Sequence, residues 1–375
     1  MNKPFLQILL VQLFSNGDCL YSTAVARQIK NDYPDSKLTW AIAAFCQNII
    51  ANNPYVDEII VTDEVVKNDV AAFRKYKKKV FAEKAAGKWD EVFITTNMDT
   101  NLALYDGTIR GMVLRAYPNV ITVPLQPVVI LTNVEKKNVS TFADKHSLKK
   151  FTNVLLWEYA PQSGQSVLNF EMVMNVATRV TTLSSTCIIL SSANKFEGTK
   201  NIVDASTLSV RENAALTHYC TLLIGCSSGI TWLTTSTAAK FLPMLQLLNA
   251  NTIFMNAPSV DFARYAIKQN GLIEMCRFSE NEIYNCLRQI ITNGFKSAVK
   301  YNQPLPLQFK TTTTIVYNLL VYREFAAIKN HYNIIKSTYG LQPIFLKAFI
   351  AGFALFPFKL LNNFIKKKIL KAFKI

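Results

Sequence analysis

The sequence predicts an α/β protein of two doubly wound, Rossmann-like domains that face each other, followed by a basic helical tail. Short apolar runs alternate with helical patterns over residues 1–150 and again over 151–320, which indicates parallel βαβ units. The chain has 375 residues, half of them apolar, so it is long enough for two hydrophobic cores. In the last segment, 321–375, no acidic residue follows Glu324, and this shift in composition predicts a separate unit.

Within the first domain, apolar runs predict strands and the segments between them predict helices. The predicted strands are 8–13, 38–43, 58–61, 91–95 and 120–123, and the predicted helices are 20–33, 46–52 and 65–88. The polar stretch 133–153 has little periodicity and is predicted to be a hinge.

The same alternation restarts in the second domain. Strands are predicted at 154–157, 187–190 and 222–225, with a helix at 167–181. A long helical pattern over 311–332 is expected to cross back to the first domain. In the tail, the apolar run 348–358 is too short to span a bilayer, and Pro357 is expected to break it.

The net charge indicates which kind of partner the protein binds, and the cysteine content indicates in which cell compartment it lies. Lys and Arg number 41 against 25 Asp and Glu, a formal charge of +16, which favours an anionic partner. The seven cysteines form no C-x-x-C pair and lie mostly in apolar surroundings, which indicates reduced thiols in a cytoplasm. The apolar run at 5–14 lacks a cleavage site and is predicted to be the first strand instead of a leader.

An acid stands directly after the first predicted strand, in the stretch "FSNGDCLYST". Asp18 follows Asn16 and Gly17, which supply a tight turn at the carboxyl end of the strand, where open α/β sheets bind ligands. Locally, Asp18 has two interpretations: a helix cap, which is common for Asp, or a functional carboxylate.

The wider stretch 15–62 resembles the opening of the heptosyltransferase-like glycosyltransferases of family 9, which have the two-domain GT-B fold. In that family the first strand ends in S-x-G-D, followed by a T-x-x-x-R-x-[LI]-K helix, a Y-P turn and N-P-Y-V-D-E. The matching residues of this chain, in order, are Ser15, Gly17, Asp18, Thr23, Arg27, Ile29, Lys30, Tyr33, Pro34 and the run 53–58. The resemblance is dense over 6–62, looser over 150–250, and absent from the tail.

The resemblance implies that Asp18 is the catalytic base, which accepts the proton of an acceptor hydroxyl as its oxygen attacks the anomeric carbon of a nucleotide sugar. Direct displacement of this kind inverts the anomeric centre and needs one carboxylate. Free N–H groups at the start of the helix favour the ionised form.

The resemblance also implies that the second domain holds the nucleotide-sugar donor. Gly225, Ser228 and Gly229 fit the family's G-x-D-[ST]-G-x-x-H segment, whereas Ser227 stands for its Asp and Trp232 for its His. The implied donor residues are Gly17, Ser163, Gly164, Gln165, Ser166, Glu197, Ser227, Ser228 and Gly229. The loop 163–166 lacks the family's phosphate-neutralising cation, for which Lys195 or Lys200 is a candidate substitute; an ordinary strand-to-helix connection is the alternative for every one of these loops.

Other chemistries lack their motifs in this sequence. No G-x-G-x-x-G follows a strand and no G-x-x-x-x-G-K-[ST] occurs, so neither a dinucleotide cofactor nor a nucleoside triphosphate is expected. His146, His218 and His331 have no metal-ligand spacing, and there is no D-x-D. No metal and no cofactor is therefore expected beyond the donor substrate.

The tail reads "KLLNNFIKKKILKAFKI", with apolar residues on one helical stripe and lysines opposite. This pattern favours a helix lying in the interface of an anionic membrane, through Lys359, Phe364, Lys366, Lys367, Lys368, Lys371 and Phe373. Packing on the protein's own core is the alternative. Nucleic acid is not expected, because no recognition motif accompanies the charge.

Together these observations predict an inverting, metal-independent glycosyltransferase, cytoplasmic and peripheral on the inner membrane of a bacterium. It would move a sugar from a nucleotide donor to a lipid-linked glycan, such as a lipopolysaccharide core or another surface polysaccharide. Two alternatives remain at this stage: a sugar-nucleotide epimerase or hydrolase on the same architecture, and a non-catalytic, membrane-bound glycan-binding partner.

Overall fold

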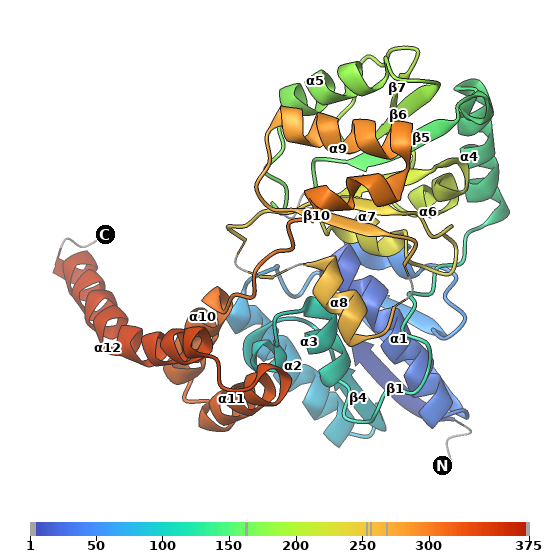
Figure 1. Cartoon of the computed structure of the whole chain (residues 1–375). Coiled ribbons are helices and arrows are strands. Elements are labelled where there is room, and N and C mark those ends of the chain that lie inside the picture. Colours follow the sequence, from blue (N-terminus) through green and yellow to red (C-terminus); the bar gives the residue numbers. More distant parts are fainter. Residues whose placement is uncertain (1–4, 162–163, 253, 256, 268, 373–375) are drawn as a thin grey trace.

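The first domain is built on a four-stranded parallel sheet in the order β3-β2-β1-β4 (Figure 1). The computed structural model describes residues 5–372 except 162–163, 253, 256 and 268, with side chains described up to Pro357. The strands are β1 Leu6–Val11, β2 Ser36–Ile42, β3 Glu58–Val61 and β4 Glu91–Ile94. The helices are α1 Asn16–Asp32, α2 Val70–Ala85 and α3 Ile109–Arg115, with 3₁₀ turns η1 Ala44–Ile50 and η2 Asp99–Leu104. The stretch 120–123, predicted as a strand, is irregular.

The second domain is built on a six-stranded parallel sheet in the order β10-β9-β8-β5-β6-β7. Its strands are β5 Asn153–Glu158, β6 Thr186–Ser191, β7 Ile202–Asp204, β8 Leu222–Gly225, β9 Met244–Leu247 and β10 Leu272–Met275. Its helices are α4 Asn133–Lys145, α5 Phe170–Val180, α6 Glu212–Leu216, α7 Gly229–Leu233, α8 Pro258–Arg264 and α9 Glu280–Asn293. Two parallel α/β sheets confirm the predicted fold class.

Helix α4 replaces the predicted hinge. Thr132 and Glu135 form a capping box, each side chain bonding the backbone N–H of the other, which fixes the start of the helix. Val139 and Phe142 are buried on one face, and Asn138 donates to Glu212 of α6. The segment 133–145 has low hydrophobicity, so its sequence pattern did not predict this capped surface helix.

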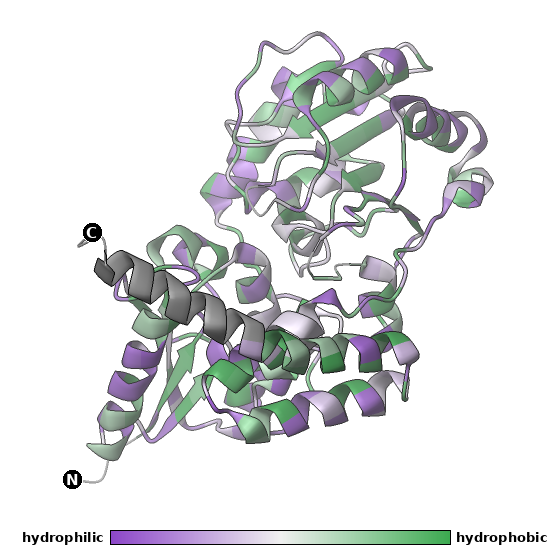
Figure 2. Cartoon of the chain, turned by 90° about the vertical axis from the view of Figure 1, so that its left-hand side faces the viewer, coloured by the Kyte–Doolittle hydropathy of each residue, from purple (hydrophilic) through white to green (hydrophobic). Residues whose placement is uncertain are grey.

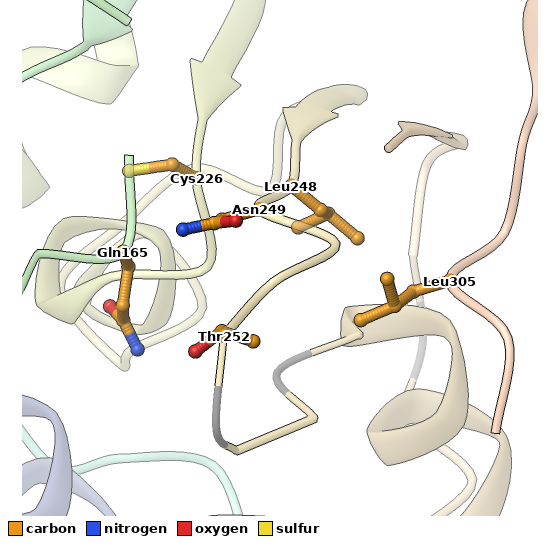
Figure 3. A pocket seen from close by; sticks show the side chains of 6 residues that line it. All are labelled: Gln165, Cys226, Leu248, Asn249, Thr252 and Leu305. Carbon is orange, nitrogen blue, oxygen red and sulfur yellow. The ribbon is translucent and has the colours of Figure 1, made fainter. Parts of the chain in front are cut away.

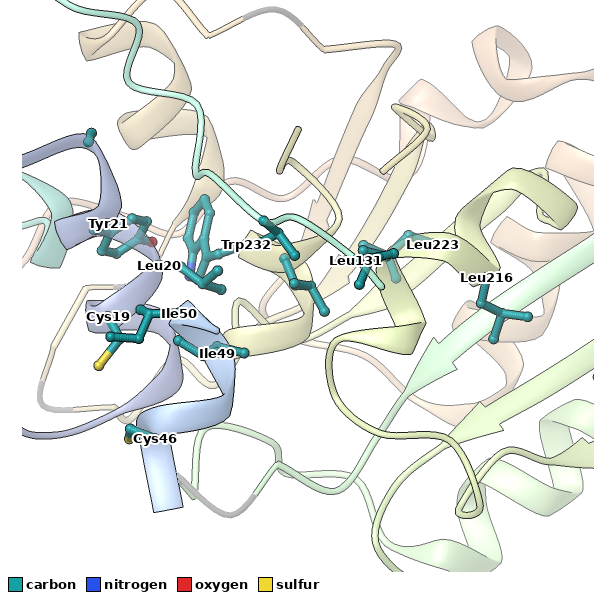
Figure 4. Packing of buried hydrophobic residues seen from close by; sticks show 14 of the residues in the cluster. Cys19, Leu20, Tyr21, Cys46, Ile49, Ile50, Leu131, Leu216, Leu223 and Trp232 are labelled. Atoms are coloured by element: carbon teal, nitrogen blue, oxygen red, sulfur yellow. The ribbon is translucent and has the colours of Figure 1, made fainter. Parts of the chain in front are cut away.

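One face of each sheet packs into a hydrophobic cluster that the two domains share (Figure 4), and the opposite face of each sheet has a cluster of its own. Leu20 and Ile49 of the first domain belong to the same buried cluster as Leu223 and Trp232 of the second. A buried arginine adds a polar link: Arg211 of the second domain donates from Nη1 to the carbonyl oxygens of Asn48 and Ala51 at 3.1 and 2.6 Å, at the end of η1. It also donates to Glu135 at 2.7 Å.

The chain then returns to the first domain through helices α10 Lys310–Val321 and α11 Phe325–Tyr339. Although α10 lies inside the 151–320 range, Ile315 and Leu319 pack with Tyr105 and Met112 of the first domain. The fully buried His331 of α11 bonds the carbonyl oxygen of Ala103. The single helix predicted over 311–332 is therefore two helices, α10 and α11. The chain turns between them at residue 323, where the backbone φ is 61°.

Helix α12, Pro343–Ala372, runs on from this bundle and leaves the body of the protein toward the C-terminus (Figure 1). It continues through Pro357, so the predicted break there is wrong. Its first half packs tightly: Phe345 is fully buried, and Gly352 approaches Val316 of α10 so closely that a Cβ would lie 2.6 Å from the Val316 Cβ. Among the described residues, no helix is long and apolar enough to cross a membrane.

The predicted membrane contacts fall at the end of this helix. Phe373 lies outside the described residues, and the others lie within α12 at positions whose side chains are not described: Lys359, Phe364, Lys366, Lys367, Lys368 and Lys371.

Candidate active site between the two domains

The turn from β1 into α1 brings Asp18 to the carboxyl edge of the first sheet. The residue with a positive φ in this turn is Ser15, at 70°, whereas Asn16 and Gly17 already belong to α1, so the tight turn predicted at Asn16 and Gly17 lies at Ser15. Ser15 occupies the N-cap, and its side chain makes no capping bond. Because Asp18 lies in the first turn of α1 and not at the cap, the capping interpretation does not hold.

Asp18 is partly buried and bonded by a residue from a second strand. The Asn97 side-chain amide, three residues beyond β4, donates to Oδ2 of Asp18 at 2.8 Å. Burial raises the pKa of Asp18 from 3.8 to about 7, while the nearby Lys67 ammonium and the Asn97 bond lower it. The carboxyl therefore sits near half ionisation at neutral pH, which suits a proton acceptor.

The second domain meets this turn with the start of α7. A Cβ built on Gly17 would lie 3.5 Å from Cδ1 of Trp232 and 3.8 Å from Cα of Gly229, and one built on Gly229 would lie 3.5 Å from Cβ of Asn16. At these distances a Cβ would be in ordinary van der Waals contact, so the two helix starts pass close to each other at this point. Gly17 and Gly229, both predicted donor residues, are brought together.

Beside this contact, a carboxyl group is bonded to one of the predicted donor residues. Glu158, at the end of β5, accepts a hydrogen bond from the Ser228 hydroxyl. Burial raises the pKa of Glu158 to about 7, against a smaller lowering by the Ser228 bond. Ser227 has a positive φ of 57° and a buried hydroxyl without a hydrogen-bond partner among the described residues. A carboxyl group thus lies where the resemblance led us to expect the donor diphosphate.

Gln165, on the segment between β5 and α5, lies near residues that follow β8 and β9 (Figure 3). Gln165 lines a small cavity with Cys226, Leu248, Asn249, Thr252 and Leu305. Its volume of about 10 Å³ suits roughly one water molecule. Gly164 has a φ of 69°, and the Ser166 hydroxyl accepts from the backbone of Leu168 at 3.1 Å. Ser163 lies outside the described residues.

The remaining predicted donor residue stands on the β6–β7 loop. Glu197, Lys195 and Lys200 are all exposed there. The loop lies beside the β5–α5 segment, since the Ser192 hydroxyl donates to the Tyr159 hydroxyl at 3.3 Å and Phe196 stacks near Phe170. In the described part of the chain, no hydrogen bond or ion pair joins any of the three to Glu158 or Ser228, so their donor roles stay predictions.

Sequence reasoning missed several residues that the fold brings to this site: Lys67, Asn97, Glu158, Arg110 and Asp261. Position held the signal for Asn97 and Glu158, because both stand at the carboxyl ends of strands, where parallel sheets collect functional groups. Among the described residues, no group of three or more His, Cys, Asp or Glu side chains could hold a metal ion.

Comparisons with known proteins agree with this architecture. The family 9 glycosyl transferase of Veillonella parvula superimposes with a TM-score of 0.53 at 16% identity, over 80% of this chain and 97% of that one. The ADP-heptose LPS heptosyltransferase II of E. coli gives 0.49 at 13% identity, over 85% of this chain and 100% of that one. No protein-family model and no curated protein sequence matches the chain. The predicted resemblance to family 9 glycosyltransferases is thus confirmed as a likeness of fold.

Proposed function

We propose that this protein is an inverting, metal-independent glycosyltransferase that moves a sugar from a nucleotide-sugar donor to a lipid-linked glycan. The acceptor class is a lipopolysaccharide core or another surface polysaccharide, reached from the cytoplasmic side of a bacterial inner membrane. The observation that carries this proposal is Asp18: a partly buried carboxyl at the edge of the first sheet, next to the Gly17 contact with the second domain, with a pKa of about 7.

In the proposed step, Asp18 accepts the proton of the acceptor hydroxyl while that oxygen attacks the anomeric carbon. The new glycosidic bond forms as the bond from the anomeric carbon to the donor's phosphate oxygen breaks, and the nucleoside diphosphate leaves with those electrons. Asn97 holds the carboxylate in place through its 2.8 Å bond. Attack from the side opposite the leaving group inverts the anomeric centre.

The donor is expected on the second domain, and its entry requires the site to rearrange. The cavity beside Gln165 is about 10 Å³, whereas ligand pockets for such molecules are of the order of 300 Å³ or more. Movement of the segments that line it, after β5 and β9, would enlarge the space next to Ser227 and Ser228. Donor binding is therefore expected to change the accessibility of Gln165 and Asn249.

In this proposal the first domain binds the acceptor, and its helix α2 contacts the helices that lead into the tail. Arg74 of α2 stacks on Tyr322 at 3.7 Å and pairs with Glu324 at 3.3 Å, so the basic run 73–79 adjoins the turn between α10 and α11. Large apolar side chains are exposed on the same helical bundle: Phe325, Leu341, Ile344, Ile350 and Phe353. Lysines beside exposed apolar side chains suit an anionic membrane surface, and Figure 2 faces this side of the molecule.

The decisive experiment replaces Asp18 with Asn. We expect turnover with a nucleotide sugar and a lipid-linked acceptor to fall by roughly 10²- to 10⁴-fold, because the base is lost, while donor affinity stays within about twofold. Asp35, an exposed acid just beyond α1, supplies the matched control as Asp35→Asn. Undiminished transfer by Asp18→Asn contradicts the proposal.

The membrane proposal has its own test, a chain ending at residue 357. This variant keeps the buried Phe345 and the Gly352 contact, so its melting temperature is expected to match that of the full chain. Binding to vesicles containing anionic phospholipid should fall at least tenfold, since several lysines near such a surface contribute about 1 kcal/mol each. Equal vesicle binding by the two chains would refute attachment through the tail.

A second candidate function is a non-catalytic glycan-binding partner. The carboxyl of Glu158 at the expected diphosphate position, together with the small cavity, favours it. Calorimetric titration with ADP-, GDP- and UDP-sugars separates the two: heat of binding for any of them supports the transferase, and the absence of binding to all three supports the glycan-binding partner.

A further inference from the structure

A buried ion pair crosses the domain boundary directly behind the candidate site. Arg110 of α3 is 1% exposed, and its Nε lies 2.9 Å from Oδ2 of Asp261 on α8. A second pair joins α8 to the segment before α3, since Nη1 of Arg264 on α8 lies 2.6 Å from Oδ2 of the fully buried Asp106. Helix α8 of the second domain is thus held to the first domain by two ion pairs.

Two aromatic rings place the Arg110 guanidinium beside the facing helix starts. Its Cζ lies 4.6 Å from the centre of the Tyr21 ring and 5.4 Å from that of Trp232. Tyr21 follows Asp18 by one turn of α1, and Trp232 follows Gly229 by one turn of α7 and reaches the contact between the domains with its Cδ1 at Gly17. Arg110 is therefore the buried cation of this contact region.

The Arg110–Asp261 pair is incompletely bonded. Nε, Nη1 and Nη2 of Arg110 and both carboxylate oxygens of Asp261 are buried without a hydrogen bond of good geometry among the described residues. The Tyr21 hydroxyl interacts with the guanidinium, and this interaction lowers the pKa of Tyr21. Burial raises the pKa of Tyr21 by more, so the net shift is upward. A buried ion without hydrogen bonds raises the free energy of the folded state. A ligand that makes these hydrogen bonds to Arg110 would therefore bind more favourably than Asp261 does.

The donor side of the site lacks such a cation. The sequence 161–166 contains no Lys or Arg, and the carboxyl at the end of β5 is Glu158. A diphosphate between the two helix starts would need positive charge close by, and a guanidinium offers a planar fork that binds two phosphate oxygens at once.

We propose that Arg110 is the residue that binds and neutralises the donor's diphosphate, and that Asp261 is its intramolecular competitor. This inference rests on the proposed function for the identity of the ligand. A phosphate displaces the Asp261 carboxylate from the guanidinium, so binding of the diphosphate and release of one of the two α8 ion pairs are the same event.

The test uses inorganic pyrophosphate and the nucleoside diphosphates ADP, GDP and UDP as calorimetric probes on the full chain. Asp261→Asn removes the competitor, and we expect it to bind pyrophosphate at least about tenfold more tightly than the wild type. The charge-cancelled variant Arg110→Gln/Asp261→Asn keeps no unpaired buried charge, so it is expected to fold, and it should bind at least about tenfold more weakly.

Arg211→Gln is the matched control, because Arg211 is another buried arginine between the domains but pairs with Glu135 away from the site. It is expected to lower the melting temperature and leave pyrophosphate affinity unchanged. If the charge-cancelled variant binds pyrophosphate as the wild type does, Arg110 is only structural and the proposal is overturned. If the wild type binds pyrophosphate through Arg110 but no nucleoside diphosphate, this inference stands and the nucleotide-sugar donor does not.

Discussion

The face that the first domain brings to the candidate site carries an acid with a cation and an amide beside it, whereas the face of the second domain carries an acid alone. Asp18 accepts from Asn97 and is influenced by Lys67; Glu158 is bonded to Ser228. Burial raises the pKa of both carboxyls to about 7. Only Asp18 is partly exposed, since Glu158 is 5% exposed.

This difference teaches that equal acidity does not mean an equal role. A partly exposed acid can meet an acceptor hydroxyl, whereas an enclosed acid beside the expected phosphate position opposes an anion whenever it is ionised. The first-domain face has the arrangement expected of a base. In the part of the chain that the structure describes, the second-domain face has no positive charge beside its carboxyl, and we propose that Arg110 supplies the charge that a diphosphate needs.

The largest effect expected is on the pH dependence of turnover. Because the base must be ionised and its pKa is about 7, kcat/KM should fall about tenfold per pH unit below 7, or roughly 100-fold at pH 5. Initial rates between pH 5 and 9 measure this. The profile should persist in Glu158→Gln; a flat profile would remove Asp18 from the role of base.

The next effect sharpens the contrast between the two acids. Glu158→Gln removes a negative charge from the donor side, so at pH 8 it should bind a nucleoside diphosphate about tenfold more tightly than the wild type. At pH 6 the two should converge, because the wild-type carboxyl with its pKa of about 7 is then neutral. Glu274→Gln, another buried carboxyl bonded to a serine, is the control. A gap that is independent of pH would break the comparison.

A smaller effect is expected at the amide that distinguishes the first-domain face. The Asn97 bond lowers the pKa of Asp18, so Asn97→Ala should move the acidic limb of the rate profile to higher pH. The rate at pH 7 should fall about threefold, and most of it should return at pH 9. Loss of rate at all pH values alike would instead indicate that Asn97 positions substrate.

The smallest expected effect concerns stability. The folded-state pKa of Asp18 is raised from 3.8 to about 7, so the wild type loses stability as pH rises between these values, and Asp18→Asn does not. The variant should therefore be more stable at pH 8 by about 1 kcal/mol, with a smaller difference at pH 5.5. Urea unfolding at the two pH values measures it; a less stable variant at pH 8 would show that the ionised carboxylate is well stabilised by the fold.

Periodicity and turn chemistry predicted the alternating architecture because strands such as 58–61 are short apolar runs between helical patterns. The positions of Gly17, Asp18 and Gly229 at the ends of strands were also predictable from the sequence. Among the local predictions that were wrong, the hinge at 133–153 contains α4, which is held by its capping box and not by hydrophobicity, and α12 passes through Pro357.

The partners within the site were beyond local reasoning. Asn97 and Asp18 are 79 residues apart, and Arg110 and Asp261 are farther apart still, so only the packing of the domains brings them together. Glu158 was likewise not predictable as a site residue, because only the fold brings the Ser228 loop beside it.

The single buried cluster that Leu20, Leu223 and Trp232 share has a consequence for how the chain folds. One face of each sheet stays uncovered until the other domain has docked, so unfolding should follow one cooperative transition in a calorimeter instead of two. A protease that cuts the connection before α4 should consequently leave the two fragments associated, and each fragment should be less stable when it is expressed alone.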